Sequence, residues 1–295
     1  MKKYLVTIAA LLTVGLIAGC GGSGSTPASS AAVSGKVADG YLVGATVFMD
    51  KNNNYQLDAG EPHTTTDANG AYTLMNVDPA DVGKYPIVAM AIKGQTTDLE
   101  TGPVSDSYVL SMPAAAVFGT HSSNFISPMS TLIREKMSPI PNRPAMTLTE
   151  AMAQLRNQMN LPAGIDMMAD YVAGSQPGTM NATQYQTMHV NAQKMAGLMA
   201  GQAGLVMPGN VMNLNRYRGM MGTINSNMPA IAVNAISSTF MTGMMTQMQA
   251  QLGAMPMTGF TNYSGLFRNM TSNRYFWNTT GGTTTPTTPM SGGMM

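Results

Sequence analysis

A regular alternation of side chains marks VSGKVADGYLVGATVFMD, residues 33–50, and TTTDANGAYTL, residues 64–74. In the first stretch valines and small residues fall on one face of an extended chain, because successive residues of a β-strand point to opposite sides. In the second, the dipeptide Asn69-Gly70 separates two strand-like runs, which is the strongest short-range sign of a hairpin. Both stretches therefore predict β structure.

Two further apolar runs continue this pattern, namely YPIVAMAI (residues 85–92) and SYVLSM (residues 107–112). The first is apolar throughout, as expected of a strand that is buried on both faces. Several short strands with turn residues between them predict a small β-sandwich over residues 33–115.

The same motifs resemble the carboxypeptidase-regulatory-like domain, a β-sandwich of the transthyretin type. This family opens with V-x-G-x-V, continues with a G-A-x-V strand and contains a T-D-x-N-G-x-Y hairpin, which match residues 33–37, 44–47 and 66–72. The resemblance implies a fold but no reaction, because such scaffolds host many functions.

Farther along the chain the apolar spacing becomes that of helices. Ser127, followed by a proline, is typical of a helix start, and Thr147 forms a capping box with the glutamate three residues on. We expect helices to begin at these two positions, and two more to cover about residues 182–205 and 230–252. The last helix has an apolar stripe made of Val233, Ile236, Phe240, Met244 and Met248.

The predicted fold class is α+β, with an N-terminal Ig/transthyretin-like β-sandwich followed by a Met-rich all-α domain over residues 116–277. Residues 278–295 contain mainly Thr, Gly, Pro and Met. Such a composition cannot build a core, and it predicts a disordered tail.

The N-terminus reads MKKYLVTIAALLTVGLIAGC, and two lysines precede an apolar run too short to span a bilayer as a mature helix. Its last four residues resemble the lipobox of bacterial lipoproteins. The resemblance implies a signal peptide over residues 1–19, a Cys20 that carries fatty acids such as palmitate and, since no aspartate follows, location in the outer membrane. Residues 20–32 are small and polar and predict a flexible tether. The alternative is a secreted protein whose single cysteine is incidental.

Charge is scarce, since Asp, Glu, Lys and Arg make up 10% of the residues. Removal of the signal peptide takes Lys2 and Lys3 away and leaves 13 basic residues against 14 acidic ones. A protein that binds nucleic acid needs a basic stripe to contact phosphates. We therefore expect no nucleic-acid partner.

The string DKNNNYQLDAGE, residues 50–61, concentrates oxygen-bearing side chains in one short stretch. In a calcium loop, oxygens at the first, third, fifth, seventh, ninth and twelfth positions point toward the ion. Counted from Asp50, these positions are Asp50, Asn52, Asn54, the carbonyl of Gln56, Asp58 and Glu61. The spacing predicts a Ca²⁺ site in the sandwich, with Leu57 packed on the core.

This string resembles the calcium loops of B-type repeats in serine-aspartate adhesins and of dockerins, which end in a similar G-E-P. Asn54 departs from the aspartate of these families, and Tyr55 stands where they have a glycine with positive φ. A non-glycine residue there costs about 1–2 kcal/mol. The alternative interpretation is a polar turn without an ion, because Asn and Asp also favour turns.

The chain has 31 methionines, and segments such as MMTQMQ resemble the Met-rich spacing of Cu(I) transport proteins. Thioethers do bind Cu(I), but methionine also replaces leucine in helical cores. The sequence shows no catalytic motif. We expect a non-enzymatic, lipid-anchored envelope protein that acts in adhesion or as a scaffold, with an envelope protein or glycan as partner. The alternatives are a Cu(I)-handling lipoprotein and a carbohydrate-binding module, for which Trp277 is poorly placed.

Overall fold

The structure is a computed structural model, and it describes residues 30–119, 124–138 and 145–255. These residues form both sheets and helices, so the chain is of the α+β class. The strands are β1 (Ala31–Val37), β2 (Leu42–Val43), β3 (Thr46–Met49), β4 (His63–Thr65), β5 (Ala71–Val77), β6 (Ile87–Ala91), β7 (Thr97–Asp98), β8 (Gly102–Pro103), β9 (Tyr108–Met112) and β10 (Asn124–Ile126).

The strands form three sheets, in the orders β10-β1-β5, β2-β7-β8 and β4-β3-β6-β9. All five residues of β6 are buried, as its apolar sequence predicts, and this strand lies between β3 and β9. β1 begins at Ala31, where it pairs with Val77 of β5. The tether expected over residues 20–32 is therefore two residues too long, because Ala31 and Ala32 already belong to β1.

The turn at Asn69-Gly70 forms, but it does not join a hairpin. The amide of Asp67 donates to the carbonyl of Ala71 at 2.8 Å, which closes the turn. The strands on its two sides then separate, since β4 pairs with β3 and β5 pairs with β1. β4 is three residues long with two exposed side chains, whereas β1 offers β5 a longer strand with a buried face. The predicted hairpin is wrong for this reason.

A strand follows the predicted end of the sandwich at residue 115. β10 pairs in parallel with β1, and Gly35 lies opposite Asn124. A Cβ atom at Gly35 would lie 1.9 Å from the carbonyl oxygen of Asn124, so only glycine permits this approach. Asn124 also donates its side-chain amide to the carbonyl of Ser34 at 2.8 Å. The sheet is thus completed by a segment far along the chain.

The helices are α1 (Pro128–Met137), α2 (Leu148–Gln158), α3 (Tyr171–Gly174), α4 (Ala182–Ala200), α5 (Ala203–Val206), α6 (Leu214–Val233) and α7 (Thr239–Ala254). The two predicted helix starts are confirmed. Ser127 caps α1 and accepts the amide of Ser130, and Thr147 caps α2 in a reciprocal capping box with Glu150. Such caps satisfy amides at the helix start that have no partner within the helix.

The helix expected over residues 230–252 is wrong. Residues 230–233 end α6, the chain turns extended at Asn234, and Ser238 caps the start of α7. Val233 and Ile236, expected on the buried stripe, are 83% and 60% exposed, whereas Met244 and Met248 are buried. Similarly, the helix expected over residues 182–205 stops at Ala200, and α5 follows as a separate turn.

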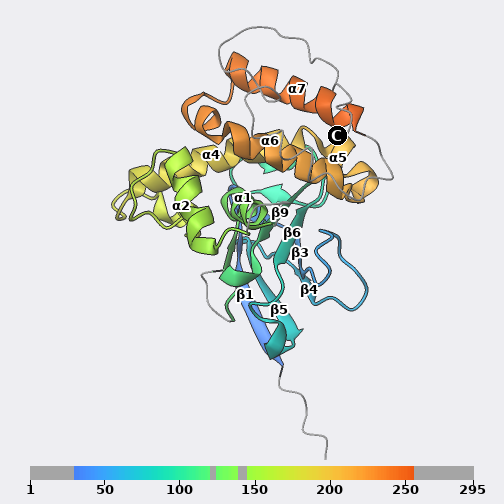
Figure 1. The fold of residues 1–295 in the computed structure, drawn as a ribbon. Helices are drawn as coiled ribbons and strands as arrows, with labels where there is room; N and C mark the ends of the chain where they lie inside the picture. Colours follow the sequence, from blue (N-terminus) through green and yellow to red (C-terminus); the bar gives the residue numbers. More distant parts are fainter. Residues whose placement is uncertain (1–29, 120–123, 139–144, 256–295) are drawn as a thin grey trace, which may run out of the picture.

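Figure 1 shows the sheets at one end of the molecule and the long helices layered over the other end. α1 packs against β9 and contacts α4 and α6, while α7 lies on α6. One continuous cluster of buried side chains runs from Val33 of β1 to Leu252 of α7. Sheet and helices therefore share a single core.

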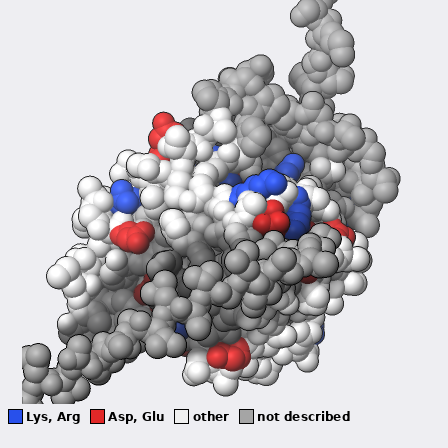
Figure 2. Space-filling view, turned by 90° about the horizontal axis from the view of Figure 1, so that it is seen from below, with Lys and Arg blue, Asp and Glu red and all other residues white. Residues whose placement is uncertain are grey.

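Charged side chains are sparse on the surface as well as in the composition. On the face drawn in Figure 2 they form small groups of mixed sign among uncharged residues. Within residues 30–119, 124–138 and 145–255, no helix has both the length and the apolar character that crossing a bilayer requires.

Candidate metal centre

The loop from Asp50 to Glu61 connects β3 to β4, and Asp50 is its most deeply buried residue. The carboxylate of Asp50 holds the first turn of the loop. Its Oδ1 accepts the amide of Asn54 at 3.1 Å, and its Oδ2 accepts the amide of Tyr55 at 3.2 Å. The main chain of Asp50 also donates to the carbonyl of Pro86 at 3.0 Å. The loop is thus fixed at the point where it leaves the sheet.

Three of the predicted ligand residues converge. Oδ2 of Asp58 accepts the side-chain amides of Asn52 and Asn54, both at 2.7 Å. The amide oxygens of the two asparagines accept main-chain N–H groups, that of Asn52 from Asn54 at 3.2 Å and that of Asn54 from Gln56 at 2.7 Å. These polar side chains therefore contact one another at the surface and organise the loop.

Glu61 closes the loop at its other end. Its Oε1 accepts the amide of Lys51 at 2.7 Å, and its Oε2 accepts the amide of Asp58 at 3.0 Å. Gly60 before it has a φ of +89°, a conformation that glycine adopts at little cost. Glu61 thereby ties the two ends of the loop together.

Tyr55 connects the loop to the helices. Its φ of +63° is that of the glycine in the resembling calcium loops, but its side chain is buried. The ring centroid lies 4.6 Å from that of Tyr217 in α6, and the hydroxyl donates to Glu135 in α1. Burial, reinforced by the charge of Glu135, raises the pKa of the Tyr55 hydroxyl well above its ordinary value. The residue that departs from the family pattern is therefore a docking side chain.

Arg134 of α1 is a site residue that the sequence did not predict. Its Nη2 donates to Oδ2 of Asp50 at 2.9 Å and to Oδ1 of Asn53 at 3.2 Å. Its guanidinium carbon lies 3.9 Å from the centroid of the Tyr55 ring, in cation–π geometry. The one sequence signal that could have indicated Arg134 was its charge, since it directly follows Ile133, a residue of the predicted apolar face of the helix. No local pattern relates that position to a loop 80 residues earlier.

Leu57 and Gln56, in the middle of the loop, differ in their contacts. Leu57 does not pack on the core, because 37% of its surface is exposed and Tyr55 occupies the docking position instead. The side-chain amide of Gln56 donates to the carbonyl of Met212 at 3.3 Å, so this residue also reaches the helical part.

The donor set of the loop suits a hard cation in its chemistry, because every side chain at a predicted position carries oxygen. Within the described part of the chain, no three His, Cys, Asp or Glu side chains come together in a metal-holding group. A calcium ion would therefore depend on the amide oxygens of Asn52 and Asn54 and on the Gln56 carbonyl. It would also share Asp50 with the guanidinium of Arg134. The Ca²⁺ site stays a prediction.

The other predicted sites lie outside the described residues or are buried. Cys20, the signal peptide and Trp277 lie outside the described residues, as does the tail at 278–295. Methionines of the proposed Cu(I) segments point into the helical core, and the exposed fractions of Met220, Met221, Met244 and Met248 are 2%, 0%, 0% and 1%. Cu(I) binding stays a prediction for which these four thioethers are poorly exposed.

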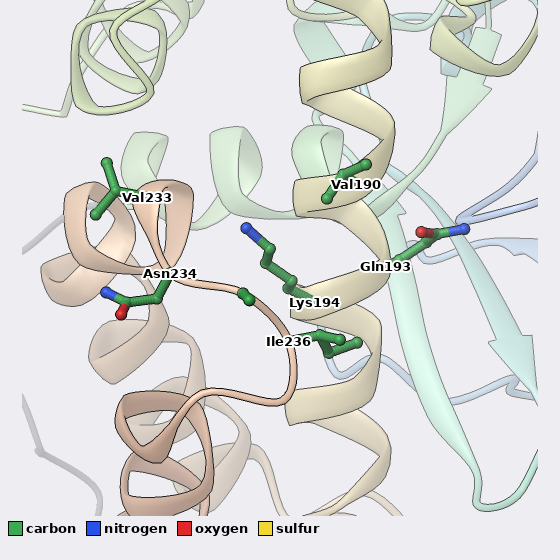
Figure 3. Close-up of a pocket in the computed structure, with 7 residues that line it drawn as sticks. Val190, Gln193, Lys194, Val233, Asn234 and Ile236 are labelled. Atoms are coloured by element: carbon green, nitrogen blue, oxygen red, sulfur yellow. The ribbon is translucent and has the colours of Figure 1, made fainter.

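A hollow of about 410 Å³ lies between α4 and the connection from α6 to α7. Figure 3 shows the Lys194 amine reaching from α4 toward the end of α6, with Val190, Val233 and Ile236 around it. Nζ of Lys194 donates to Oδ1 of Asn191 and to the carbonyls of Ile231 and Ala232, at 3.1, 3.0 and 3.3 Å. Burial lowers the pKa of this amine. Its three hydrogens are all used within the protein, so the hollow offers an anion no free N–H from Lys194.

The loop from Asp50 to Glu61 is thus one polar site at which the sheet and the helices are joined. Comparison of the chain with protein-family models, with curated proteins and with solved structures finds no match.

Proposed function

We propose that this protein is a non-enzymatic, lipid-anchored scaffold or adhesion protein of the cell envelope, in which a calcium-binding loop fastens a β-sandwich to a helical layer. The observation that supports this role is the position of the loop. Asp50 contacts Arg134, and Tyr55 contacts both α1 and α6. An ion bound there would have a structural role, because it would stabilise the junction between sheet and helices. It would not take part in a reaction.

The finer fold belongs to this proposal. We take the sheets β10-β1-β5 and β4-β3-β6-β9 as the two layers of a transthyretin-type, Ig-like sandwich, as the sequence motifs imply. Each contributes a buried face, with the paired Val33 and Leu74 from the first and the paired Phe48 and Val88 from the second. Two layers with buried inner faces are what a sandwich requires.

The lipid anchor also has a geometric consequence. About ten residues separate Cys20 from β1, and a fully extended segment of that length spans at most about 35 Å. Figure 1 shows that β1 enters the molecule at the end opposite α6 and α7. An anchor at Cys20 would hold the sheets near the outer membrane and present the helices away from it, toward an envelope protein or glycan.

Thermal unfolding with calcium and with EGTA tests the metal part of the proposal. Extracellular calcium sites have Kd values of about 10⁻⁴–10⁻³ M. At about 10 mM calcium such a site stabilises the folded state by about 1.4–2.7 kcal/mol. For a protein of this size the melting temperature should rise by roughly 3–10 °C.

The Asp58→Asn variant should lose this response, because it removes a charged ligand from an exposed part of the loop. Asp106→Asn is the matched control, since Asp106 is an exposed carboxylate that pairs with Lys93 and does not belong to the loop. If neither wild type nor Asp58→Asn changes its melting temperature between EGTA and calcium, the loop is a metal-free turn.

A further inference from the structure

A second polar seam joins the sheets to α3 and α4, and a buried carboxylate lies at its centre. Asp39, in the turn between β1 and β2, has 6% of its surface exposed. Its Oδ2 accepts the hydroxyl of Tyr108 in β9 at 2.9 Å. Its Oδ1 is also buried and has no hydrogen-bond donor among the described residues. A buried carboxylate with a single side-chain donor, and that a neutral one, is poorly stabilised as an anion.

The neighbours of Asp39 oppose its ionisation. Asp98 is buried at the end of β7, where it accepts the amide of Glu100 at 2.8 Å and the hydroxyl of Thr101 at 2.9 Å. Burial, followed by the negative charge of Asp98, raises the pKa of Asp39 to about 7, against smaller opposing effects of the Tyr108 hydroxyl and of the main-chain amide of Asp39. Glu100 adds to the repulsion.

The residues around Asp39 also make the contacts across the seam. Tyr171 of α3 donates its hydroxyl to the carbonyl of Ala38, the residue before Asp39, at 2.9 Å. Nε2 of His189 in α4 lies 3.0 Å from Oε2 of Glu100. That contact lacks hydrogen-bond geometry, so it attracts through charge and only when the imidazole is protonated.

The remaining groups at the seam complete its charge pattern. Gln193 of α4 donates to Oε2 of Glu100 at 2.9 Å. At the outer edge, Tyr41 donates to Asp170 at 2.7 Å, and Lys36 lies 3.7 Å from the same carboxylate. The groups that act on Asp39 are thus two carboxylates and a tyrosine hydroxyl from the sheet side, with Tyr171 and His189 facing them from the helices.

We propose that Asp39 is a proton-controlled switch, which keeps the sheets and helices α3 and α4 together when it is protonated and loosens this seam when it ionises. A protonated Asp39 removes the repulsion against Asp98 and Glu100. An ionised Asp39 places three carboxylates together beside the contacts of Tyr171 and His189, which cross the seam.

The sign of the pH effect follows from proton linkage. The folded protein holds the Asp39 proton up to about pH 7, whereas the unfolded chain releases it near the ordinary value of 3.8. Stability from this group is therefore complete below about pH 4 and is lost as the pH rises through about 7. The difference corresponds at most to about a thousand-fold change in the folding equilibrium. The switch does not depend on calcium.

Hydrogen exchange of the full chain in detergent, at about pH 5.5 and about pH 8.5 and corrected for intrinsic rates, tests the switch. In wild type, peptides from α3 and the first half of α4 should be less protected at the higher pH, while peptides from α7 keep their protection. Asp39→Asn should abolish the pH dependence, because the amide retains an acceptor for Tyr108 and carries no charge. Asp106→Asn, an exposed control, should respond like wild type.

Equal pH responses of wild type and Asp39→Asn would overturn the proposal. Should Asp39→Asn not fold, the carboxyl carbon signals of wild type labelled with ¹³C-aspartate decide the question. An aspartate that titrates near neutral pH supports the switch, and titration of every aspartate below about pH 5 contradicts it.

Discussion

At the scale of single residues, Tyr55 combines an unfavourable backbone with a favourable side chain. Its positive φ costs about 1–2 kcal/mol relative to glycine. Its ring lies between Arg134 and Tyr217, and loss of a buried aromatic ring costs about 3–5 kcal/mol. The second effect is larger, so the residue that weakens the resemblance to calcium loops stabilises the junction in this protein.

We therefore expect Tyr55→Gly to lower the free energy of unfolding by about 2–4 kcal/mol, although it relieves the backbone strain. Urea unfolding followed by circular dichroism measures the change. Leu57 is two residues away and has an exposed side chain. The free energy of unfolding of Leu57→Ala should therefore stay within about 0.5 kcal/mol of the wild-type value. A Tyr55→Gly variant as stable as wild type would mean that the ring contributes only about 1–2 kcal/mol, which the relieved backbone strain offsets, and this would contradict a dominant docking role.

The pair of Arg134 and Asp50 gives a second prediction. The two side chains are 7% and 0% exposed, so removal of one leaves the other buried without its partner. Arg134→Met should destabilise the protein by about 3–5 kcal/mol, and the double variant with Asp50→Asn should recover part of this loss. A double-mutant cycle in urea gives the coupling. The exposed pair Lys93 and Asp106 is the control, with an expected coupling below about 1 kcal/mol. If the destabilisations caused by the Arg134 and Asp50 substitutions simply add in the double variant, the energetic contact between the two side chains is contradicted.

The sequence predicted the members of the loop and not its partners. Alternating oxygens at residues 50–61 are a local pattern, and the structure does bring Asn52, Asn54 and Asp58 together. The contact to Arg134 depends on how α1 packs against the sheet, which no spacing within the loop encodes. The sequence therefore predicted which residues form the loop, but it did not predict which residues from other elements contact them.

At the scale of elements, local signals were reliable where the cause is local. The caps at Ser127 and Thr147 use side chains three residues away, and both were predicted. The end of α6 was missed, because an apolar stripe runs on through Val233 and Ile236 in the sequence. The carbonyls of Ile231 and Ala232 are instead bound by Lys194, which comes from another helix.

Replacement of Lys194 by methionine should therefore destabilise the end of α6. The variant keeps most of the apolar stem and leaves two carbonyls without their donor, at a cost of about 1–3 kcal/mol. Hydrogen exchange of peptides from the end of α6 should quicken more than that of peptides from its start. Lys84→Met, at an exposed lysine, serves as the control. Unchanged protection at residues 230–234 would contradict a capping role.

At the scale of the whole molecule, the sheets and helices share one core. The α+β class was predicted, but the boundary placed between residues 115 and 116 separates β10 and α1 from the strands they contact. β10 pairs with β1, and α1 packs on β9. Composition changes along the chain indicate where strands give way to helices. They do not indicate which later segments return to complete the sheet.

A fragment that ends at residue 115 should accordingly fail to fold, because it lacks β10 and exposes the face of β9 that α1 covers. We expect poorly dispersed amide signals in its NMR spectrum and no cooperative thermal transition. A matched fragment that ends at residue 138 restores both elements and should gain structure. A cooperative transition in the shorter fragment would show that the strands before residue 115 form an independent domain.

The position of β1 in the centre of its sheet sets the order in which the chain can mature. Ser34 and Asn124 are 90 residues apart, and β1 has no neighbour on one side until β10 arrives. If the chain is exported from its N-terminus, as we propose, its first strand stays unfinished while the 90 residues up to Asn124 cross the membrane, and such distant pairing is slow. Under that proposal, the delay would leave β1 with an unpaired edge that chaperones of the envelope could protect until β10 completes the sheet.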